Sequence, residues 1–315
     1  MGIIKHIGNF IVERNGDFEG GDHIHSFIGM SDDELDNITI DVFELIKEKV
    51  LQVAYGYANS LIITGQSGVG KTHDVTTTLE GANLREGIDY IFNSGNISEA
   101  NLFEELFMNH DKLIIFDDCD SVFKDVNTLK SALDSKPKRT VTRKLKSHFD
   151  VAGMTMNDII ANFKGDKSMA DNKQLFFPKN KGKLPKQFTF TGRVIFISNL
   201  KQHEIDPALV TRATASIDVD LTHEEVLERL KGILTSMKPD IPDEMKEEVL
   251  NLVDYLTMNF ETRHPLSIRT VANAMDTRVS NDKRYKTING KKYPLWAIMI
   301  KEDLVGKKAK KRPTE

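Results

Sequence analysis

The sequence contains a single cysteine, Cys119, so it cannot form an intramolecular disulfide. One free thiol fits a reducing compartment better than a secreted protein. No apolar run approaches the roughly 20 residues that a membrane-spanning helix needs. The first residues lack the apolar core of a secretory signal. Met1 and Gly2 are followed by His6 where a myristoylation signal has Ser or Thr. We therefore expect a protein of the cytoplasm, or of the host cytoplasm if the source is viral, with no membrane partner.

A change of pattern near Leu221 divides the sequence in two. Before it, short apolar strands alternate with helical segments, which is typical of a parallel sheet covered by helices on both faces. After it, apolar residues recur only at helical spacing. The expected strands cover residues 60–64, 88–95, 112–118, 193–199 and 215–221. The later helices are expected at residues 222–237, 242–260 and 266–279. The 315 residues thus predict an α/β fold followed by an all-helical domain.

Local capping signals predict where several helices begin. The apolar residues between Asp32 and Ala54 recur at three- and four-residue steps, and Ser31 with Glu34 has the form of a capping box. Ser98 precedes a second amphipathic segment as its expected cap. Thr222 opens the helical domain with a glutamate three residues later.

A phosphate-binding loop follows the first expected strand. Its sequence G-x-x-x-x-G-K-T lets glycines turn the backbone so that several N–H groups point at phosphates. Lys71 is expected to reach the β- and γ-phosphates, and Thr72 to bind Mg²⁺ at the start of a helix. A chance glycine-rich turn is the alternative, but the required strand and helix flank the loop. The expected phosphate-binding residues are Gly65, Gln66, Ser67, Gly68, Val69, Gly70, Lys71 and Thr72.

Two carboxylates end the third expected strand, in the sequence LIIFDD. In a nucleotide-binding sheet Asp117 would hold Mg²⁺ through water, and Asp118 would orient or deprotonate an attacking water. An acidic turn after a strand is the alternative. Asp120 is expected to be a helix cap or a solvated group. Asn199 ends the fourth strand, where parallel sheets bind ligands, and its amide could hold the same water.

Two arginines further along the chain complete the candidate catalytic set. Arg212, in the sequence DPALVTR, could be presented to the nucleotide of a neighbouring subunit and stabilise transition-state charge. Arg269, in the first turn of the segment beginning LSIR, could reach the phosphates from the helical domain. For both, a surface salt bridge is the alternative.

These motifs, taken in order over residues 35–280, resemble the AAA+ ATPases, and the phrases FTFTGRVIFISN and LKSALDSKPKR resemble the stand-alone AAA+ proteins of large bacteriophages. The resemblance implies ATP and Mg²⁺ as ligands and an oligomeric ring, usually hexameric. By the same resemblance Asn199 would be sensor 1, Arg212 the arginine finger and Arg269 sensor 2. The implied domains are a leader at 1–30, an AAA+ core at 31–221, a helical lid at 222–285 and a C-terminal extension with a basic tail at 286–315.

The sequence departs from the family pattern in places, so other classes of P-loop protein are considered as alternatives. Asp118 stands where many hydrolysing members have Glu, which keeps open a nucleotide-gated binder that does not hydrolyse ATP. No Asn-Lys-x-Asp signature of GTPases and no Leu-Ser-Gly-Gly signature of transport ATPases occurs. Superfamily 3 helicases share the paired aspartates and the Ser-Asn strand end, but they usually lack a lid that carries Arg269.

A basic insertion, residues 136–193, suggests what the ATPase acts on. It contains fourteen Lys or Arg and four Asp, whereas the rest of the chain is acidic. In a ring, such a segment could follow a phosphate backbone, with Phe176 and Phe177 as stacking groups. The expected nucleic-acid contacts are Lys138, Arg139, Arg143 and Lys144. A solvated insertion is one alternative. Another is a protein-remodelling ATPase that grips its client through Tyr90 or Phe92.

Overall fold

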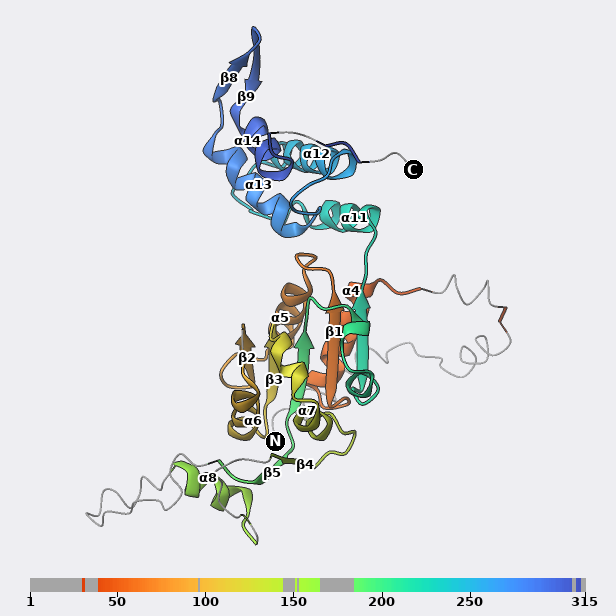
Figure 1. Ribbon diagram of the computed structural model, residues 1–315, viewed down its shortest axis with the longest axis vertical. Coiled ribbons are helices and arrows are strands. Elements are labelled where there is room, and N and C mark those ends of the chain that lie inside the picture. The colour runs from red at the N-terminus through yellow and green to blue at the C-terminus, as the bar shows by residue number, and fades with distance from the viewer. Residues whose placement is uncertain are drawn as a thin grey trace, which may run out of the picture. The chain divides into compact units, whose positions relative to one another are not determined.

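The structure, a computed structural model, describes residues 30–31, 39–95, 97–143, 151, 153–164, 184–307 and 310–312 (Figure 1). It divides into two compact units. The core unit runs to Gly65 and resumes from Thr72 to Asp218. The helical unit consists of the loop Gln66–Lys71 and the chain from Val219 onward. The expected leader, residues 1–30, lies outside the described residues except at its last position.

The core unit is built on a five-stranded sheet of order β2-β3-β6-β1-β7 (Figure 1). β3 pairs in parallel with β2 and with β6, and β6 pairs in parallel with β1. The strands are β1 (Ser60–Gly65), β2 (Tyr90–Ser94), β3 (Leu113–Asp117), β6 (Arg193–Ile197) and β7 (Ala215–Val219). Each lies within a segment predicted as a strand or extends it by one residue, so the predicted parallel α/β core is confirmed.

Helices and short turns of helix connect these strands. They are α4 (Val42–Ala54), α5 (Lys71–Gly81), α6 (Glu99–Met108), η1 (Asp120–Lys124), α7 (Val126–Ala132), α8 (Met156–Lys164), η2 (Gln202–Glu204) and α10 (Pro207–Val210). Ser98 caps α6 as predicted, because its hydroxyl accepts a hydrogen bond from the N–H of Asn101.

Among the described residues, the first helix, α4, starts later than the apolar spacing predicted. Asp41 is the cap of α4, since its carboxylate accepts hydrogen bonds from the N–H groups of Phe43 and Glu44. Residues 39–41 are not helical, so the prediction of one continuous helix from Asp32 to Ala54 is wrong. Glu34, half of the predicted capping box, lies outside the described residues. A local carboxylate that satisfies the first free N–H groups outweighs apolar periodicity in fixing the start.

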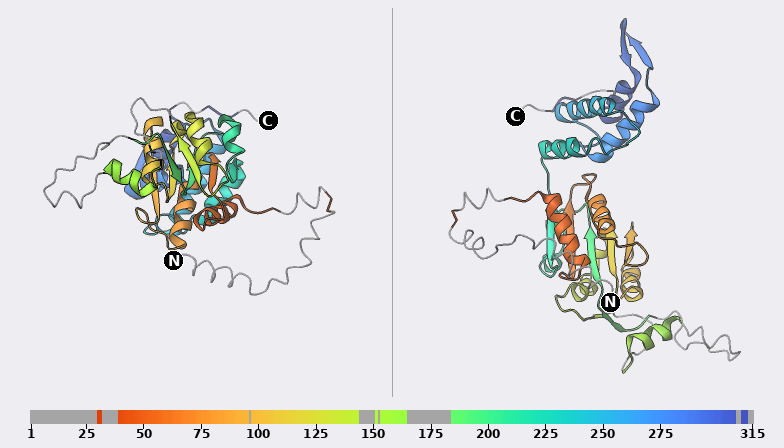
Figure 2. Two further views of the ribbon diagram at one scale, coloured as in Figure 1. Left: turned by 90° about the horizontal axis from the view of Figure 1, so that it is seen from below. Right: turned by 180° about the vertical axis from the view of Figure 1, so that it is seen from behind.

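A two-stranded antiparallel hairpin, β4 (Arg139–Thr142) with β5 (Gln187–Phe190), was not predicted. It leads directly into β6 at the amino-terminal end of that strand, where the Arg193 N–H donates to the carbonyl of Lys112. Phe188 anchors it to the core, with its ring centroid 5.1 Å from that of Phe103. The hairpin and α8 therefore lie at the end of the sheet opposite the carboxyl ends of the strands (Figures 1 and 2).

The helical unit contains α11 (His223–Ile233), α12 (Asp243–Asn259), α13 (Ile268–Ser280) and α14 (Leu295–Leu304). Thr222 and Glu225 form the predicted capping box. The chain beyond α13 forms a second hairpin, β8 (Tyr285–Ile288) with β9 (Lys291–Pro294), before α14 packs against α12 and α13. The unit is thus not purely helical. In the described part of the chain, no helix has the length and apolar character needed to cross a bilayer.

Candidate nucleotide-binding site

The predicted phosphate loop joins the end of β1 directly to the start of α5. Three of its glycines have the positive φ angles that side chains rarely tolerate: 113° at Gly65, 79° at Gly68 and 104° at Gly70. These angles turn the backbone sharply between strand and helix. Because α5 begins at Lys71, the loop ends at a helix N-terminus, whose free N–H groups attract anions. The local conformation is the one that phosphate binding requires.

Lys71 is buried within this loop, with only 5% of its surface exposed. Its ammonium group donates a hydrogen bond of 2.6 Å to the carbonyl of Gln66. A buried ammonium needs hydrogen-bonded oxygen partners, because desolvation of an unpaired charge is costly. The side chain of Lys71 therefore folds back over its own loop. From this position its ammonium group could donate hydrogen bonds to phosphate oxygens.

Two elements of the helical unit hold the backbone of the loop. The N–H of Ile268, the first residue of α13, donates to the carbonyl of Gly68 at 2.9 Å. The guanidinium Nε of Arg229, on α11, donates to the carbonyl of Val69 at 2.9 Å. A Cβ atom added at Gly68 would lie 3.1 Å from the side chain of Ser267. Arg229 and Ser267 were not predicted as site residues, because no local pattern marks contacts between residues so far apart in the chain.

Thr72 and Asp117 meet at the carboxyl end of the sheet. The Thr72 hydroxyl donates to the Asp117 carboxylate at 2.9 Å, although the two residues are 45 positions apart. Mg²⁺ is usually held by one or two protein oxygens together with substrate phosphates and water. This hydroxyl and carboxylate fit such a site. Among the described residues no cluster of three or more His, Cys, Asp or Glu could hold a metal without such help.

Asp118 adopts a left-handed backbone conformation, with φ at 52°. Its N–H donates to the carbonyl of Ile197 at 3.0 Å, which fixes the backbone against the end of β6. Its carboxylate accepts a hydrogen bond from the side-chain amide of Asn199. A non-glycine residue held at positive φ costs free energy and is often found at a functional site. The paired side chains are both exposed to solvent.

The two residues after Asp118, Cys119 and Asp120, contribute to the packing of the strand ends. Asp120 accepts a hydrogen bond of 2.5 Å from the hydroxyl of Ser198, which ties the turn after β3 to the end of β6. The prediction of a helix cap or a solvated group is therefore wrong for Asp120, because its side chain is partly buried and makes no capping hydrogen bond to η1. Cys119 is buried, and burial beside Asp117 raises the pKa of its thiol to about 11.

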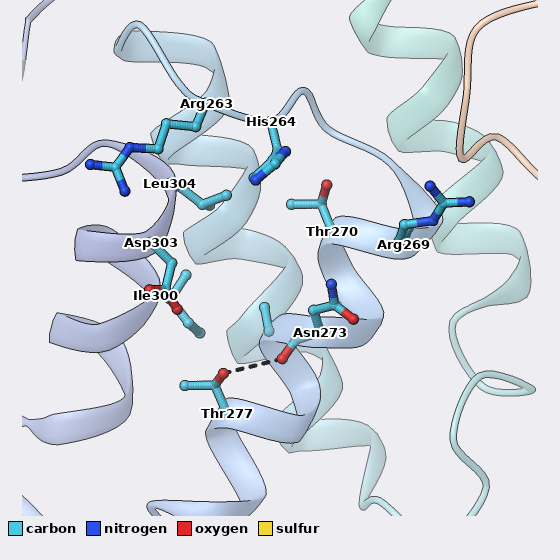
Figure 3. A pocket seen from close by; sticks show the side chains of 10 residues that line it. Arg263, His264, Arg269, Thr270, Asn273, Thr277, Ile300, Asp303 and Leu304 are labelled. Atoms are coloured by element: carbon cyan, nitrogen blue, oxygen red, sulfur yellow. Dashed lines mark hydrogen bonds between the residues drawn. The ribbon is translucent and has the colours of Figure 1, made fainter. Parts of the chain in front are cut away.

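Arg212 and Arg269 are not brought to these groups by any hydrogen bond or ion pair found among the described residues. Arg212 is exposed and follows α10, with its guanidinium donating to the carbonyl of Lys130 at 3.2 Å. Arg269 is exposed on the first turn of α13. There it lines a cavity of about 500 Å³ within the helical unit. Figure 3 shows Arg269, Thr270 and Asn273 on one side of this cavity and side chains of α14 on the other.

The structure overturns one of the four expected nucleic-acid contacts. Arg139 is only 2% exposed, and its guanidinium donates to the carbonyls of Ala132 and Gly192. It also lies over the Phe190 ring at 4.8 Å from the centroid, and burial lowers its pKa to about 10. Arg139 therefore braces the first hairpin and has no free face for a phosphate.

The other basic residues of the insertion differ in their surroundings. Lys138 is exposed, while Arg143 is partly buried 3.9 Å from the carboxylate of Asp125. Lys144, Phe176 and Phe177 lie outside the described residues.

Neither expected protein-gripping residue lies in a loop. Tyr90 and Phe92 are both within β2, where Tyr90 pairs with Leu113 and Phe92 with Ile115. Tyr90 is only 3% exposed, and burial raises the pKa of its hydroxyl. The prediction is therefore wrong for Tyr90, whose ring is buried, whereas for Phe92, which is partly exposed on the edge strand β2, it stays a prediction.

Comparisons with known proteins give remote similarities. No protein-family model matches the chain. An uncharacterized 36.7 kDa protein from the nrdC–mobD intergenic region of Enterobacteria phage T4 is 26% identical over 252 residues, which cover 74% of this chain and 67% of the phage protein. Domain III of the replication initiation protein DnaA of Thermotoga maritima gives a TM-score of 0.42 at 15% identity, with 84% of this chain and 93% of that chain covered.

Two further solved structures lie in the same range. A RuvB variant of Thermotoga maritima gives a TM-score of 0.43 at 14% identity, covering 82% of this chain and 69% of that chain. The FIGL-1 AAA domain in complex with ADP gives 0.35 at 13% identity, covering 76% and 69%. Similarity at this level assigns no role to any residue here. The chain's own sheet order and loop give the P-loop α/β fold that the resemblance to AAA+ ATPases implied.

Proposed function

We propose that this chain is an AAA+ ATPase that binds ATP with Mg²⁺. It would hydrolyse the bond between the β- and γ-phosphates and use the released free energy to move or remodel a macromolecule. The contact between Thr72 and Asp117 is the observation that supports this most. It joins Thr72, the last residue of the phosphate-loop motif, to Asp117, the carboxylate that ends the apolar strand β3. A chance glycine-rich turn would have no reason to end beside that carboxylate.

Each residue of the site has a distinct task in this proposal. The loop N–H groups and Lys71 hold the phosphates, and Thr72 with Asp117 holds the Mg²⁺ shell. When bound, Mg²⁺ would neutralise charge on the β- and γ-phosphate oxygens. Asp118 accepts a proton from the attacking water, and the Asn199 amide fixes the orientation of that carboxylate. The exposure of both groups leaves room for water between them and a phosphate.

Arg212 is proposed to act on the nucleotide of a neighbouring subunit in a ring. This proposal is supported by the exposure of Arg212, whose guanidinium donates to the backbone carbonyl of Lys130 and is otherwise open to solvent. Arg269 is proposed to sense the nucleotide from the helical unit. The N–H of Ile268, its neighbour on α13, already bonds the phosphate loop.

The first test is the steady-state ATPase rate of the purified chain and of Lys71→Ala. We expect Lys71→Ala to lose ATP binding or turnover, while Lys124→Ala, which changes an exposed lysine, keeps the parent rate. Normal activity in Lys71→Ala would remove the assignment. Asp118→Asn should bind ATP without turning it over. A parent that binds ATP but never hydrolyses it would favour the nucleotide-gated binder instead.

The trans role of Arg212 has a sharper test in mixed subunits. Arg212→Ala should bind ATP but turn it over slowly, and Lys71→Ala should be inactive. When the two variants are mixed, some Arg212→Ala subunits, whose phosphate loop is intact, lie next to Lys71→Ala subunits, whose Arg212 is intact. Part of the activity should therefore return. If no activity returns although mixed assemblies form, Arg212 does not act across subunits.

The client is proposed to be nucleic acid. Support comes from the exposed Lys138 and the overall charge of the insertion. The protein-gripping alternative is weakened because the ring of Tyr90 is buried, which leaves Phe92 as its candidate. The ATPase rate should rise with single-stranded DNA, double-stranded DNA or RNA, and the stimulation should fade with salt. A steady rate indifferent to all three would point to a protein client.

A further inference from the structure

The hairpin between α13 and α14 projects from the helical unit with both faces uncovered (Figures 1 and 2). Every residue from Lys283 to Tyr293 is exposed. An isolated two-stranded hairpin is marginally stable in water, and two helices can be joined by a much shorter turn. The ten residues of the hairpin are therefore more than the connection needs, and nothing in the described chain covers them.

The hairpin is nonetheless held in one register. Tyr285 pairs with Pro294 and Ile288 with Lys291, around a turn of Asn289 and Gly290. The φ angles of these two turn residues are 50° and 79°, which match the tight Asn-Gly turn favoured in hairpins.

Its base is fixed to the helices on either side. The N–H of Leu295 donates to the carbonyl of Arg284 at 2.8 Å, and the Arg284 guanidinium donates to the Asn281 side chain at 2.9 Å. A fixed register on a fixed base makes the hairpin a defined surface rather than a loose loop.

The charge of this surface has one sign. Residues 283–296 contain five basic residues and no Asp or Glu, in a chain whose net charge is -4. The basic residues are Lys283, Arg284, Lys286, Lys291 and Lys292. Exposed lysines in a row repel one another, so their clustering is explained best by a polyanionic partner.

Aromatic rings alternate with these lysines on each face. Directly opposed residues of an antiparallel pair share a face, so Tyr293 lies beside Lys286, and Tyr285 shares its face with Lys292. Tyr285 is 62% exposed and Tyr293 is 44% exposed. Exposed aromatic rings next to ammonium groups can bind a nucleic-acid strand, because the rings stack on its bases and the ammonium groups contact its phosphates. Only unpaired bases present their faces for stacking.

We propose that the β8–β9 hairpin is a binding surface for single-stranded nucleic acid, in which the tyrosine on each face stacks on a base and the lysines beside it contact phosphates. The hairpin is a different segment of the chain from the basic insertion, residues 136–193, whose residue Arg139 is buried. This proposal deepens the proposed function by naming the client class, and it rests on that function only for coupling to ATP.

The test measures binding of a fluorescently labelled oligothymidine by the full chain, with a duplex of equal length and polyglutamate as competitors. Tyr285→Ala/Tyr293→Ala should weaken oligothymidine binding by about tenfold or more, because a stacked base contributes roughly 1.4 kcal/mol, the equivalent of tenfold. Tyr285→Phe/Tyr293→Phe should keep most of it. Tyr57→Ala, which removes a ring 61% exposed in the core unit, is the matched control.

The lysines are tested by salt dependence. Lys286→Gln/Lys291→Gln/Lys292→Gln should weaken binding and lower the slope of log affinity against log salt by about 2, at roughly 0.7 for each phosphate contact on a single strand. The same lysines changed to Arg should restore the slope. Lys47→Gln/Lys124→Gln/Lys231→Gln removes an equal number of exposed lysines elsewhere and should leave it unchanged.

Some outcomes would overturn the proposal. Parent-like binding in both hairpin variants would show that the surface does not bind the strand. Equal competition by the duplex or by polyglutamate would reduce it to a general polyanion surface. The basal ATPase rate of the hairpin variants should match that of the parent, and Lys71→Ala should still bind oligothymidine. Failure of ATP hydrolysis in the parent would therefore remove the proposed function and leave hairpin binding to stand or fall separately.

Discussion

The side-chain amide of Asn199 donates a hydrogen bond to the carboxylate of Asp118, and the two residues lie just beyond the carboxyl ends of the neighbouring strands β6 and β3. Asp118 is held at a φ of 52° by its own N–H bond to Ile197. The carboxylate is therefore fixed from two sides, through its backbone and through its side chain. This is the arrangement expected of a group that must orient a water molecule.

Removal of the Asn199 amide should slow hydrolysis more than it weakens ATP binding. We expect Asn199→Ala to lower the turnover rate by about 100-fold, the effect typical of losing one positioned hydrogen-bond donor. ATP affinity should change little. The measurements are steady-state turnover and equilibrium binding, with Asn127→Ala as an exposed control. A parent-like turnover in Asn199→Ala would show that the pairing is incidental.

Thr72→Ala should raise the Mg²⁺ concentration needed for activity by about tenfold or more, because the change removes the hydroxyl that we propose as a ligand of the metal. Thr72→Ser keeps the hydroxyl that donates to Asp117 and should behave as the parent. A Mg²⁺ titration of the ATPase rate measures the effect. If Ala and Ser variants respond alike, the hydroxyl is not part of the metal site.

Gly68→Ala should disturb the phosphate loop. Its φ of 79° costs an alanine about 1–2 kcal/mol, and the new Cβ would lie 3.1 Å from Ser267. Both ATP affinity and melting temperature should fall. Gly232→Ala, on helix α11 with open space around it, should instead be neutral or stabilising by about 0.5–1 kcal/mol. Equal melting temperatures for the two variants would contradict the strain argument.

Arg139→Met should destabilise the core unit. The change leaves the carbonyls of Ala132 and Gly192 without their buried donor, at a cost of about 2–4 kcal/mol. Lys138→Met, at the exposed neighbour, should change stability by less than about 0.5 kcal/mol. Chemical denaturation of both variants measures the difference. If Arg139→Met loses nucleic-acid binding without losing stability, the residue acts at the surface after all.

Cys119 should resist alkylation in the folded protein. Burial raises the pKa of its thiol to about 11, and only the thiolate reacts. At neutral pH almost all of the thiol is therefore protonated, and the reactive fraction grows only as pH rises toward that value. Iodoacetamide should label the denatured chain rapidly and the native chain very slowly. Rapid native labelling at neutral pH would contradict both the burial and the raised pKa.

The features predicted correctly depend on residues close together in the chain. The short apolar runs of β1 and β3 are typical of buried strands, and the glycines before Lys71 permit the turn that the loop makes. The Thr222–Glu225 box also forms within three residues. Such patterns carry their own structural consequence, because period and capping act over one or two turns.

Features that depend on distant residues were missed or mistaken. Arg139 reads as one more cation in a basic segment, and only the folding of β5 beside it supplies the carbonyl of Gly192 that buries it. Arg229 reaches Val69 across 160 positions of chain. Local spacing therefore fixed the strands, the loop and the caps. Whether a charged side chain is buried or exposed was decided by the tertiary structure. A charge can be buried only where folding brings distant backbone groups within hydrogen-bond distance of it.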